Sequence, residues 1–169
     1  KVIALFKLSC VCAVIVPRAS PQLENMHIWV DQAKGTNYPD TPGTQGQPFK
    51  SITFALALAK NLGWPEPWHI HIRPGVYDAD PCKPDIETEV FPIKLRQDMI
   101  LEGIDPNSCI IDGQHFTEGY VPLVYGKNLT NLEIHGLTLR NMYHNGSGGA
   151  AELINCAGRV RNCIFQNNC

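Results

Sequence analysis

The chain has 169 residues, of which 44% are hydrophobic and 18% are charged, and this composition excludes an intrinsically disordered protein. Its 14 glycines and 13 prolines favour many turns over long helices, and its length allows one domain with a sizeable core. The net charge is −2, so the chain lacks the overall basic field that binds nucleic acid, and no nucleic-acid partner is expected.

Residues 1–20 have the pattern of a secretory signal peptide. Two lysines precede a nine-residue apolar run at positions 8–16, which is far shorter than the ~20 residues that span a bilayer. The alternatives are a lipoprotein signal ending at Cys10 and a buried first strand. The pattern predicts a secreted or cell-surface protein with no membrane span in this part of the chain, and residues 21–169 as its folded domain.

One strand and one helix are predicted in the next part of the chain. Residues 26–30 read as a short strand, and residues 32–47 as a long loop rich in Gly, Thr, Pro and Asn. An amphipathic helix is predicted over about 49–62, with Ser51 or Thr53 available as its N-cap. The apolar positions at helical spacing are Ile52, Ala55, Leu56, Ala59 and Leu62.

Beyond residue 67 the hydrophobic pattern changes to a period of two, which indicates strands. The expected strands are at 68–73, 90–95, 99–101, 109–111, 123–125, 132–139, 151–154 and 160–165. The intervals between them hold no helix of ten residues or more, so a βαβ arrangement is not expected.

An internal repeat selects among the all-β architectures. Residues 134–141 align with 160–167 at an offset of 26, and 99–103 align with 132–136 at an offset of 33. Periods of this length indicate stacked repeats, and several strands per period describe the coils of a parallel β-helix. Asn141 would then lie over Asn167 and begin an asparagine ladder. A β-sandwich with coincidental similarity is the alternative.

Four segments carry a family resemblance: IWVD at 28–31, PGT at 42–44, PFKSI at 48–52 and PGVY at 74–77. They resemble the N-terminal segment of pectate-lyase-like proteins, and are similar to the start of family 9 polysaccharide lyases and of a domain of unknown function in surface β-helix proteins. The resemblance implies an all-β, right-handed single-stranded parallel β-helix of the pectin-lyase-like type. It also implies that the chain holds the N-terminal coils, one capping α-helix and a truncated C-terminal end.

The cap has a physical role in such a fold. A stack of coils leaves the apolar core open at its end, and repeat architectures need a terminal cap. We expect the helix at 49–62 to close this end, with Leu56 facing the core.

The resemblance also implies a function. In β-helix polysaccharide enzymes the substrate lies along the outer face of a parallel sheet in the middle coils. We therefore expect the N-terminal, non-catalytic part of an extracellular β-helix protein that acts on or binds polysaccharide or a cell-surface glycan, above all acidic uronate glycans. If the protein is an enzyme, it is a polysaccharide lyase or a related carbohydrate-active enzyme with catalytic residues beyond residue 169. The alternative is a non-enzymatic secreted or surface-displayed β-helix, adhesin-like or structural.

Outward positions of the predicted coils supply candidate binding residues. Alternation sends Glu133 and His135 outward on one coil, beneath Arg159 and Arg161 of the next. Arg140, Arg159 and Arg161 would form a basic strip that binds the carboxylates of an acidic glycan. Ordinary charge pairing across the sheet is the alternative.

No cofactor site is evident, and Ca²⁺ is the one metal considered. The acids of the loop around Cys82 could supply its oxygen ligands, with a solvated loop as the alternative: Asp78, Asp80, Asp85, Glu87 and Glu89. No Cys or His spacing matches a metal pattern, so no metal ligand is assigned. His69 and His71 share one face of a strand and are interpreted as edge positions.

The remaining candidates lie in loops. His115, Tyr143 and His144 could act as acid, base or sugar-stacking groups, with solvated loop positions as the alternative. Asn128 and Asn145 begin sequons and would carry glycans in a eukaryotic secretory pathway. One or two disulfides are expected in an exported chain, among Cys82, Cys109, Cys156, Cys163 and Cys169.

Overall fold

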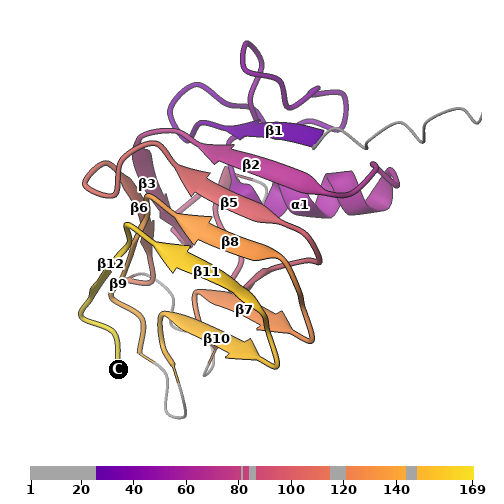
Figure 1. The fold of residues 1–169 in the computed structure, drawn as a ribbon. Coiled ribbons are helices and arrows are strands. Elements are labelled where there is room, and N and C mark those ends of the chain that lie inside the picture. The colour runs from indigo at the N-terminus through magenta and orange to yellow at the C-terminus, as the bar shows by residue number, and fades with distance from the viewer. Residues whose placement is uncertain (1–25, 81, 84–86, 115–120, 144–147) are drawn as a thin grey trace, which may run out of the picture.

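The computed structural model describes residues 26–80, 82–83, 87–114, 121–143 and 148–169 (Figure 1). Along the chain, helix α1 (Ile52–Asn61) follows strand β1 (Met26–Val30) and precedes strand β2 (Trp68–Ile72). Every other element in these ranges is a strand. The predicted signal segment lies outside them, and no helix within them is long and apolar enough to cross a membrane.

The strands form three parallel sheets. Sheet A has the order β1, β2, β5 (Ile100–Gly103), β8 (Leu132–His135) and β11 (Gly158–Arg161). Sheet B consists of β3 (Gly75–Asp78), β6 (Cys109–Asp112), β9 (Thr138–Arg140) and β12 (Ile164–Gln166). Sheet C consists of β4 (Ile93–Lys94), β7 (Val124–Lys127) and β10 (Ala151–Ile154).

From β2 onward the chain visits sheets A, B and C in turn, so that β2, β3 and β4 form one coil and β5, β6 and β7 the next (Figure 1). The third coil is β8, β9 and β10, and β11 and β12 follow. This is an all-β parallel β-helix, as predicted. The β-sandwich alternative is wrong, because every strand pair in the three sheets is parallel.

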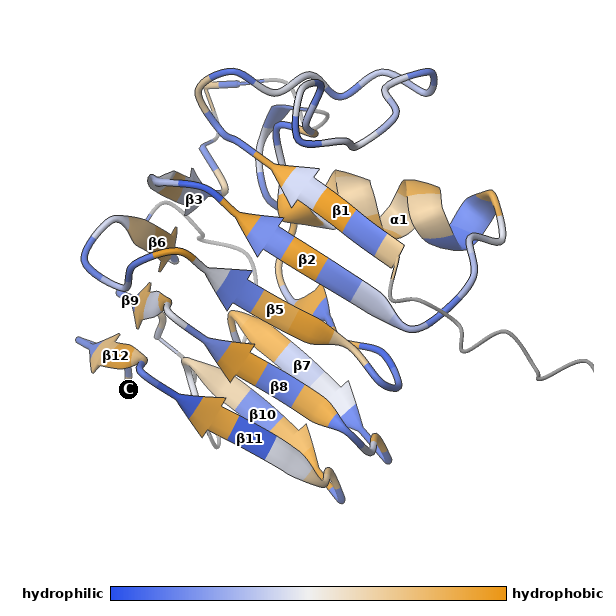
Figure 2. Cartoon of the chain, turned by 45° about the horizontal axis from the view of Figure 1, so that its top comes forward, coloured by the Kyte–Doolittle hydropathy of each residue, from blue (hydrophilic) through white to orange (hydrophobic). Residues whose placement is uncertain are grey.

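The register confirms both repeat offsets. Val160 lies beside Ile134 and Phe165 beside Leu139, an offset of 26 residues. Leu101 lies beside Ile134, an offset of 33. Stacking equivalent residues puts apolar side chains in continuous inward columns, and Figure 2 shows the resulting alternation of apolar and polar residues along the strands of sheet A.

The asparagine ladder is also confirmed. The Asn167 side-chain amide donates to Oδ1 of Asn141 over 3.2 Å, and the Asn141 amide donates to Oδ1 of Asp112 over 3.0 Å. Asn141 and Asn167 have φ values of 57° and 52°, a left-handed conformation that asparagine tolerates better than most residues. The ladder therefore joins three successive coils at one corner.

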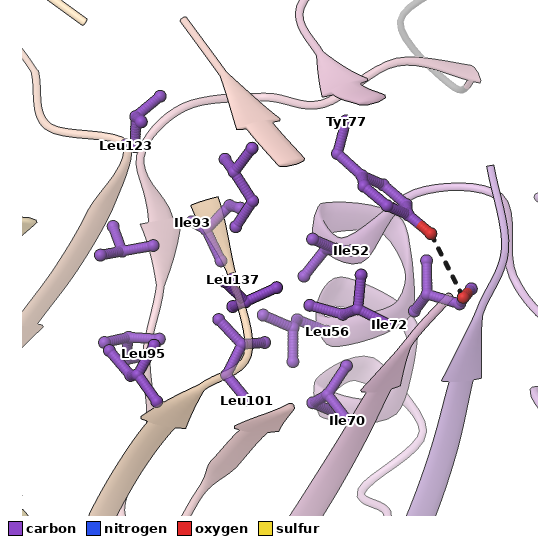
Figure 3. Close-up of a cluster of buried hydrophobic side chains, with 14 of the residues drawn as sticks. Ile52, Leu56, Ile70, Ile72, Tyr77, Ile93, Leu95, Leu101, Leu123 and Leu137 are labelled. Atoms are coloured by element: carbon purple, nitrogen blue, oxygen red, sulfur yellow. Dashed lines mark hydrogen bonds between the residues drawn. The ribbon is translucent and has the colours of Figure 1, made fainter. Parts of the chain in front are cut away.

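Helix α1 closes the first end of the stack, as expected. Ser51 is the N-cap, and the helix buries Ile52, Ala55, Leu56 and Ala59 in the same core as the first coils (Figure 3). The helix starts later than predicted because Phe49 extends sheet A instead. The Phe49 amide donates to the Trp29 carbonyl, and the Phe49 carbonyl accepts from the Asp31 amide.

Glu89 anchors the start of this helix from a loop that was expected to be solvated. It is buried, and its carboxylate accepts hydrogen bonds from the Ile52 amide at 2.6 Å, the Thr53 amide at 2.9 Å and the Thr53 hydroxyl at 2.8 Å. The two backbone amides are among the donors that have no partner within the helix at its start. Burial raises the pKa of Glu89 to about 7, with the nearby Asp78 carboxylate acting in the same direction.

This raised pKa predicts a pH-dependent stability. Below pH 4.5 Glu89 is protonated in both states, whereas between about pH 4.5 and 7 the unfolded chain ionises and the folded chain keeps its proton. The free energy of unfolding should therefore fall over this window, by at most about 3 kcal/mol. Urea unfolding at several pH values should show that Glu89→Gln removes this fall. Glu87→Gln, a neighbouring exposed acid, should keep it, and equal pH profiles for wild type and Glu89→Gln would contradict the assignment.

The predicted disulfides do not form among the five described cysteines. All five are free: Cys82, Cys109, Cys156, Cys163 and Cys169.

The side chains of β11 and β12 are exposed even where they continue the inward columns, including Val160 and Phe165. Within the described residues, these apolar side chains are uncovered.

Candidate functional site

In the described residues, the outer face of sheet A carries histidine, glutamate, arginine and tryptophan side chains close together. The parallel register aligns them in two rows that run across the strands, and the second row lies two residues farther along each strand. The first row, from β1 to β11, is His27, His69, Ile100, Glu133 and Arg159. The second row is Trp29, His71, Glu102, His135 and Arg161.

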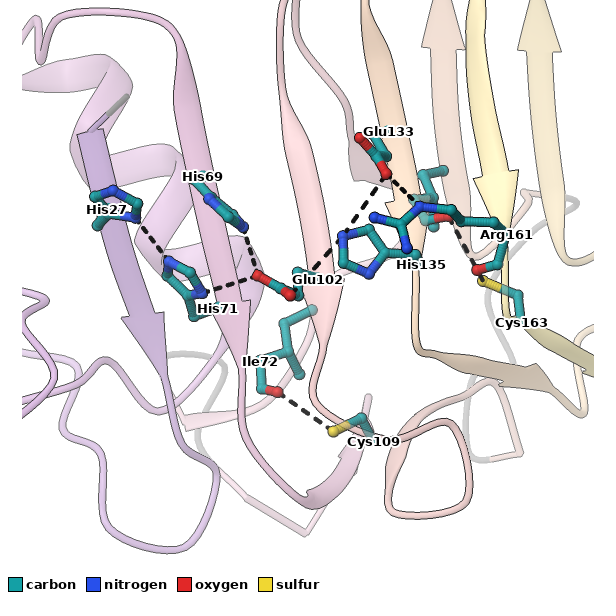
Figure 4. Close-up of polar contacts among 11 residues, drawn as sticks. His27, His69, His71, Ile72, Glu102, Cys109, Glu133, His135, Arg161 and Cys163 are labelled. Carbon is teal, nitrogen blue, oxygen red and sulfur yellow. Dashed lines mark hydrogen bonds and ion pairs between the residues drawn. The ribbon is translucent and has the colours of Figure 1, made fainter. Parts of the chain in front are cut away.

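Three histidines of this face lie together on β1 and β2 (Figure 4). His27 Nδ1 is 2.8 Å from His71 Nε2, and the His69 and His71 rings stack with centroids 3.9 Å apart. One ring nitrogen from each of the three lies within 4.8 Å of the other two, a spacing that could hold a metal ion. The histidines come from adjacent strands because β1 pairs in register with β2.

Glu102 on the next strand holds two of these rings. Its Oε2 lies 2.6 Å from Nε2 of His69 and 3.1 Å from Nδ1 of His71 (Figure 4). Burial lowers the pKa of both histidines, and the neighbouring His69 lowers that of His71 further, to about 4, while Glu102 opposes both shifts. At neutral pH the His69 and His71 rings are therefore uncharged, and each has one ring nitrogen that carries a lone pair.

Farther along the face lies an ion pair between two residues that are diagonal neighbours in the register. The Arg161 guanidinium donates through Nε to Oε1 of Glu133 over 2.5 Å, and this bond lowers the pKa of Glu133. Arg159, which lies directly beside Glu133 in the register, forms no ion pair with a described residue. His135 is buried between the two acids, with Nε2 3.9 Å from Glu133 and 4.0 Å from Glu102.

An aromatic and charged group borders the histidines at the end of β1. The half-buried Trp29 ring stacks on His71 at 4.2 Å, and the Arg73 guanidinium lies 5.3 Å from its centroid. Asp31 accepts from the backbone amides of Ala33 and Lys34 and pairs with Arg73 at 3.3 Å. Asp31 therefore has the turn role that its loop position suggests.

The three arginines of the predicted strip do not share one sheet. Arg159 and Arg161 lie on β11 in sheet A, whereas Arg140 lies on β9 in sheet B. Arg140 donates to Asp112 over 2.7 Å. Although burial opposes it, the hydrogen bonds from Asn141 and Arg140 lower the pKa of Asp112. Among the predicted residues, the exposed Arg159 is the one cation of this set without an ionic partner in the described chain.

The interpretation of His69 and His71 as edge positions is wrong. Strand β2 lies inside sheet A, between β1 and β5. Sequence reasoning assigned no metal ligand, because His27 is far from the pair along the chain and no repeat offset connects β1 to β2. The available signal was the shared face of His69 and His71, together with a strand at 26–30 that needed a pairing partner.

The other candidate residues are dispersed. Tyr143 is exposed, and Asn128 is exposed at a turn where its Oδ1 accepts from the Asn155 side chain. Asp78 and Asp80 face Lys83, with its Nζ 3.9 Å and 3.1 Å away, and the Glu87 carboxylate pairs with Lys50 at 2.6 Å. His115, His144, Asn145 and Asp85 lie outside the described residues.

Comparisons with known proteins place this fold in a family without an assigned activity. A family model described as "Protein of unknown function (DUF1565)" matches residues 33–120. No curated protein and no solved structure matches the chain. The matched range includes most of the segment whose motifs resemble β-helix N-termini, and it spans just over half of the sequence. The chain belongs to the DUF1565 family.

Proposed function

We propose that this chain is the N-terminal, non-catalytic part of an extracellular, pectate-lyase-like β-helix protein, and that the outer face of sheet A binds polysaccharide. The observation that carries the proposal is the continuous outer face itself. Five parallel strands present two aligned rows of side chains on it, which are polar, charged or aromatic except for Ile100. Adjacent strands are about 4.8 Å apart, comparable with one sugar unit, so an extended glycan that runs across the strands can meet a new side chain of each row with each sugar unit.

The charges at the β11 end of this face favour an acidic glycan. Asp31 is paired with Arg73, and Glu133 with Arg161. Glu102 contacts the uncharged His69 and His71, and it lies on β5, two strands away from Arg159 on β11. Arg159 is then the unpaired cation among the described residues of the face, and a guanidinium binds a carboxylate through strong, charge-assisted hydrogen bonds.

Affinity electrophoresis in gels containing polygalacturonate tests the proposal. The wild-type chain should be retarded more by polygalacturonate than by a neutral polymer of similar length. Arg159→Gln should weaken this retardation about tenfold or more, since a hydrogen bond to a charged group contributes about 1.5–3 kcal/mol.

Lys127→Gln is the matched control. It removes one exposed positive charge from the end of β7 in sheet C and should leave the retardation unchanged. Equal retardation by neutral and acidic polymers, or equal weakening by both substitutions, would exclude the acidic-glycan site. Absence of retardation by every polysaccharide would favour the non-enzymatic display protein instead.

A further inference from the structure

The three clustered histidines have an arrangement that glycan binding does not require. We infer that His27, His69 and His71 bind one late first-row divalent transition-metal ion, of the zinc or copper class, and that Glu102 orients two of these ligands. This inference does not depend on the proposed carbohydrate binding.

The geometry needs little rearrangement to hold an ion. In a tetrahedral zinc site with Zn–N bonds of about 2.0–2.1 Å, two ligand nitrogens lie about 3.4 Å apart. The contact of 2.8 Å between Nδ1 of His27 and Nε2 of His71 is slightly shorter than this, and the three-way limit of 4.8 Å is longer. The rings must therefore rotate about their side-chain bonds to bring all three nitrogens to the ligand distance.

The strands make this arrangement stable. His69 and His71 are two residues apart on β2 and therefore point to the same face, and His27 lies beside His69 in the register. The His27 ring stacks on the His71 ring with centroids 5.0 Å apart. Ligands fixed on paired strands pay little conformational entropy when an ion binds.

Glu102 has the position of a carboxylate that holds the histidine ligands without contacting the metal ion itself. Histidine ligands usually donate their other ring N–H to a carboxylate or carbonyl, which fixes the tautomer and makes the ligand nitrogen more basic. His71 directs Nε2 towards His27 and Nδ1 towards Glu102, so one ring nitrogen is available for the ion and the other is held. His69 contacts the same carboxylate oxygen over 2.6 Å (Figure 4).

The ligand chemistry identifies the class of metal. Imidazole nitrogens suit zinc, copper and nickel, whereas calcium and magnesium prefer oxygen ligands. Three histidines leave a fourth coordination position for water or another ligand. His27 is exposed, so an ion can enter from solvent.

Isothermal titration of the full chain with ZnCl₂ and CuCl₂, after its thiols are blocked with N-ethylmaleimide, tests the site. The expected result is one equivalent of each ion bound, and no comparable binding of CaCl₂. His27→Gln and His71→Gln should each abolish this equivalent. Glu102→Gln should weaken binding by about 10–100-fold, as loss of a carboxylate that holds histidine ligands does.

His135→Gln is the matched control, because His135 belongs to the same row as His71 but lies beyond β5. It should keep the equivalent, and near-UV circular dichroism should show that all variants are folded. Failure of both zinc and copper to bind, or equal losses in His135→Gln and His27→Gln, would overturn the inference.

Trp29 supplies an independent readout. Its ring stacks on His71 at 4.2 Å, so a Cu²⁺ ion bound by the three histidines should quench its fluorescence. Trp29→Phe should lose most of this quenching while it still binds one Cu²⁺ in the titration. Undiminished quenching in Trp29→Phe would place the ion elsewhere and overturn the inference.

Discussion

Replacing Leu56 with aspartate should lower the free energy of unfolding by about 3–5 kcal/mol. Leu56 is 7% exposed and belongs to the buried cluster that joins α1 to the first coils (Figure 3). Loss of a buried leucine alone costs about 2–5 kcal/mol, and a carboxylate cannot replace its apolar contacts. A domain of ordinary stability has about 5–15 kcal/mol in total, so this change removes a large share of it.

The same residue also borders a groove of about 500 Å³ between α1 and residues 90–96. An aspartate at this position could turn towards the groove and stay hydrated, which limits the cost mainly to the lost packing. Thermal melting by circular dichroism and the yield of soluble protein should both fall. Ala57→Asp places the same charge on the next, exposed position of the helix and should change stability by about 1 kcal/mol at most. Similar melting of both variants would contradict the capping role.

The repeat predicted the fold because parallel stacking keeps equivalent residues in one column. Once Ile134 was aligned with Val160, the register of sheet A between β8 and β11 followed directly. The same alignment predicted the Asn141–Asn167 ladder, since it needs only that one corner lies over the next. Pairing between strands that are far apart in the chain could therefore be predicted wherever the sequence repeats itself.

The sequence could not predict contacts outside the repeat. Strand β1 precedes the first full coil and is separated from β2 by a long loop and the helix, so no offset placed His27 beside His69. Glu89 illustrates the same limit. Its partners, the amides of Ile52 and Thr53, lie at a helix start more than 30 residues earlier, and nothing in the loop's composition indicates them.

The alternation of apolar and polar residues along a strand also gives limited information about the fold. It distinguishes inward from outward positions, but it does not show where the chain leaves one sheet for the next. The corner at Gly136 and Leu137 carries the chain from sheet A to sheet B, and this separates Arg140 from Arg159 and Arg161. The prediction of a basic strip was therefore right about the outward direction of the three arginines. It was wrong about their sheet, because it missed the corner that puts Arg140 in sheet B.

That corner is the basis of a second large expected effect, because two coils approach each other closely there. A Cβ atom added at Gly136 would lie 2.0 Å from the carbonyl oxygen of Gly103, and one added at Gly103 would lie 2.1 Å from the carbonyl oxygen of Gly136. The clashing atoms belong to the backbone, so no side-chain rotation can relieve the clash. Gly136 also has a φ of 67°, where alanine is strained.

Gly136→Ala should therefore lower the free energy of unfolding by about 2–5 kcal/mol, as the sum of about 1–2 kcal/mol for the left-handed conformation and about 1–3 kcal/mol for forcing the coils apart. Gly63→Ala separates the two effects, because Gly63 has nearly the same φ, 65°, with nothing within 4 Å of an added Cβ. Urea unfolding should give the conformational cost alone for Gly63→Ala and a clearly larger loss for Gly136→Ala. Equal losses would mean that the coils at this corner can separate freely, and close stacking of Gly103 on Gly136 would then contribute nothing to stability.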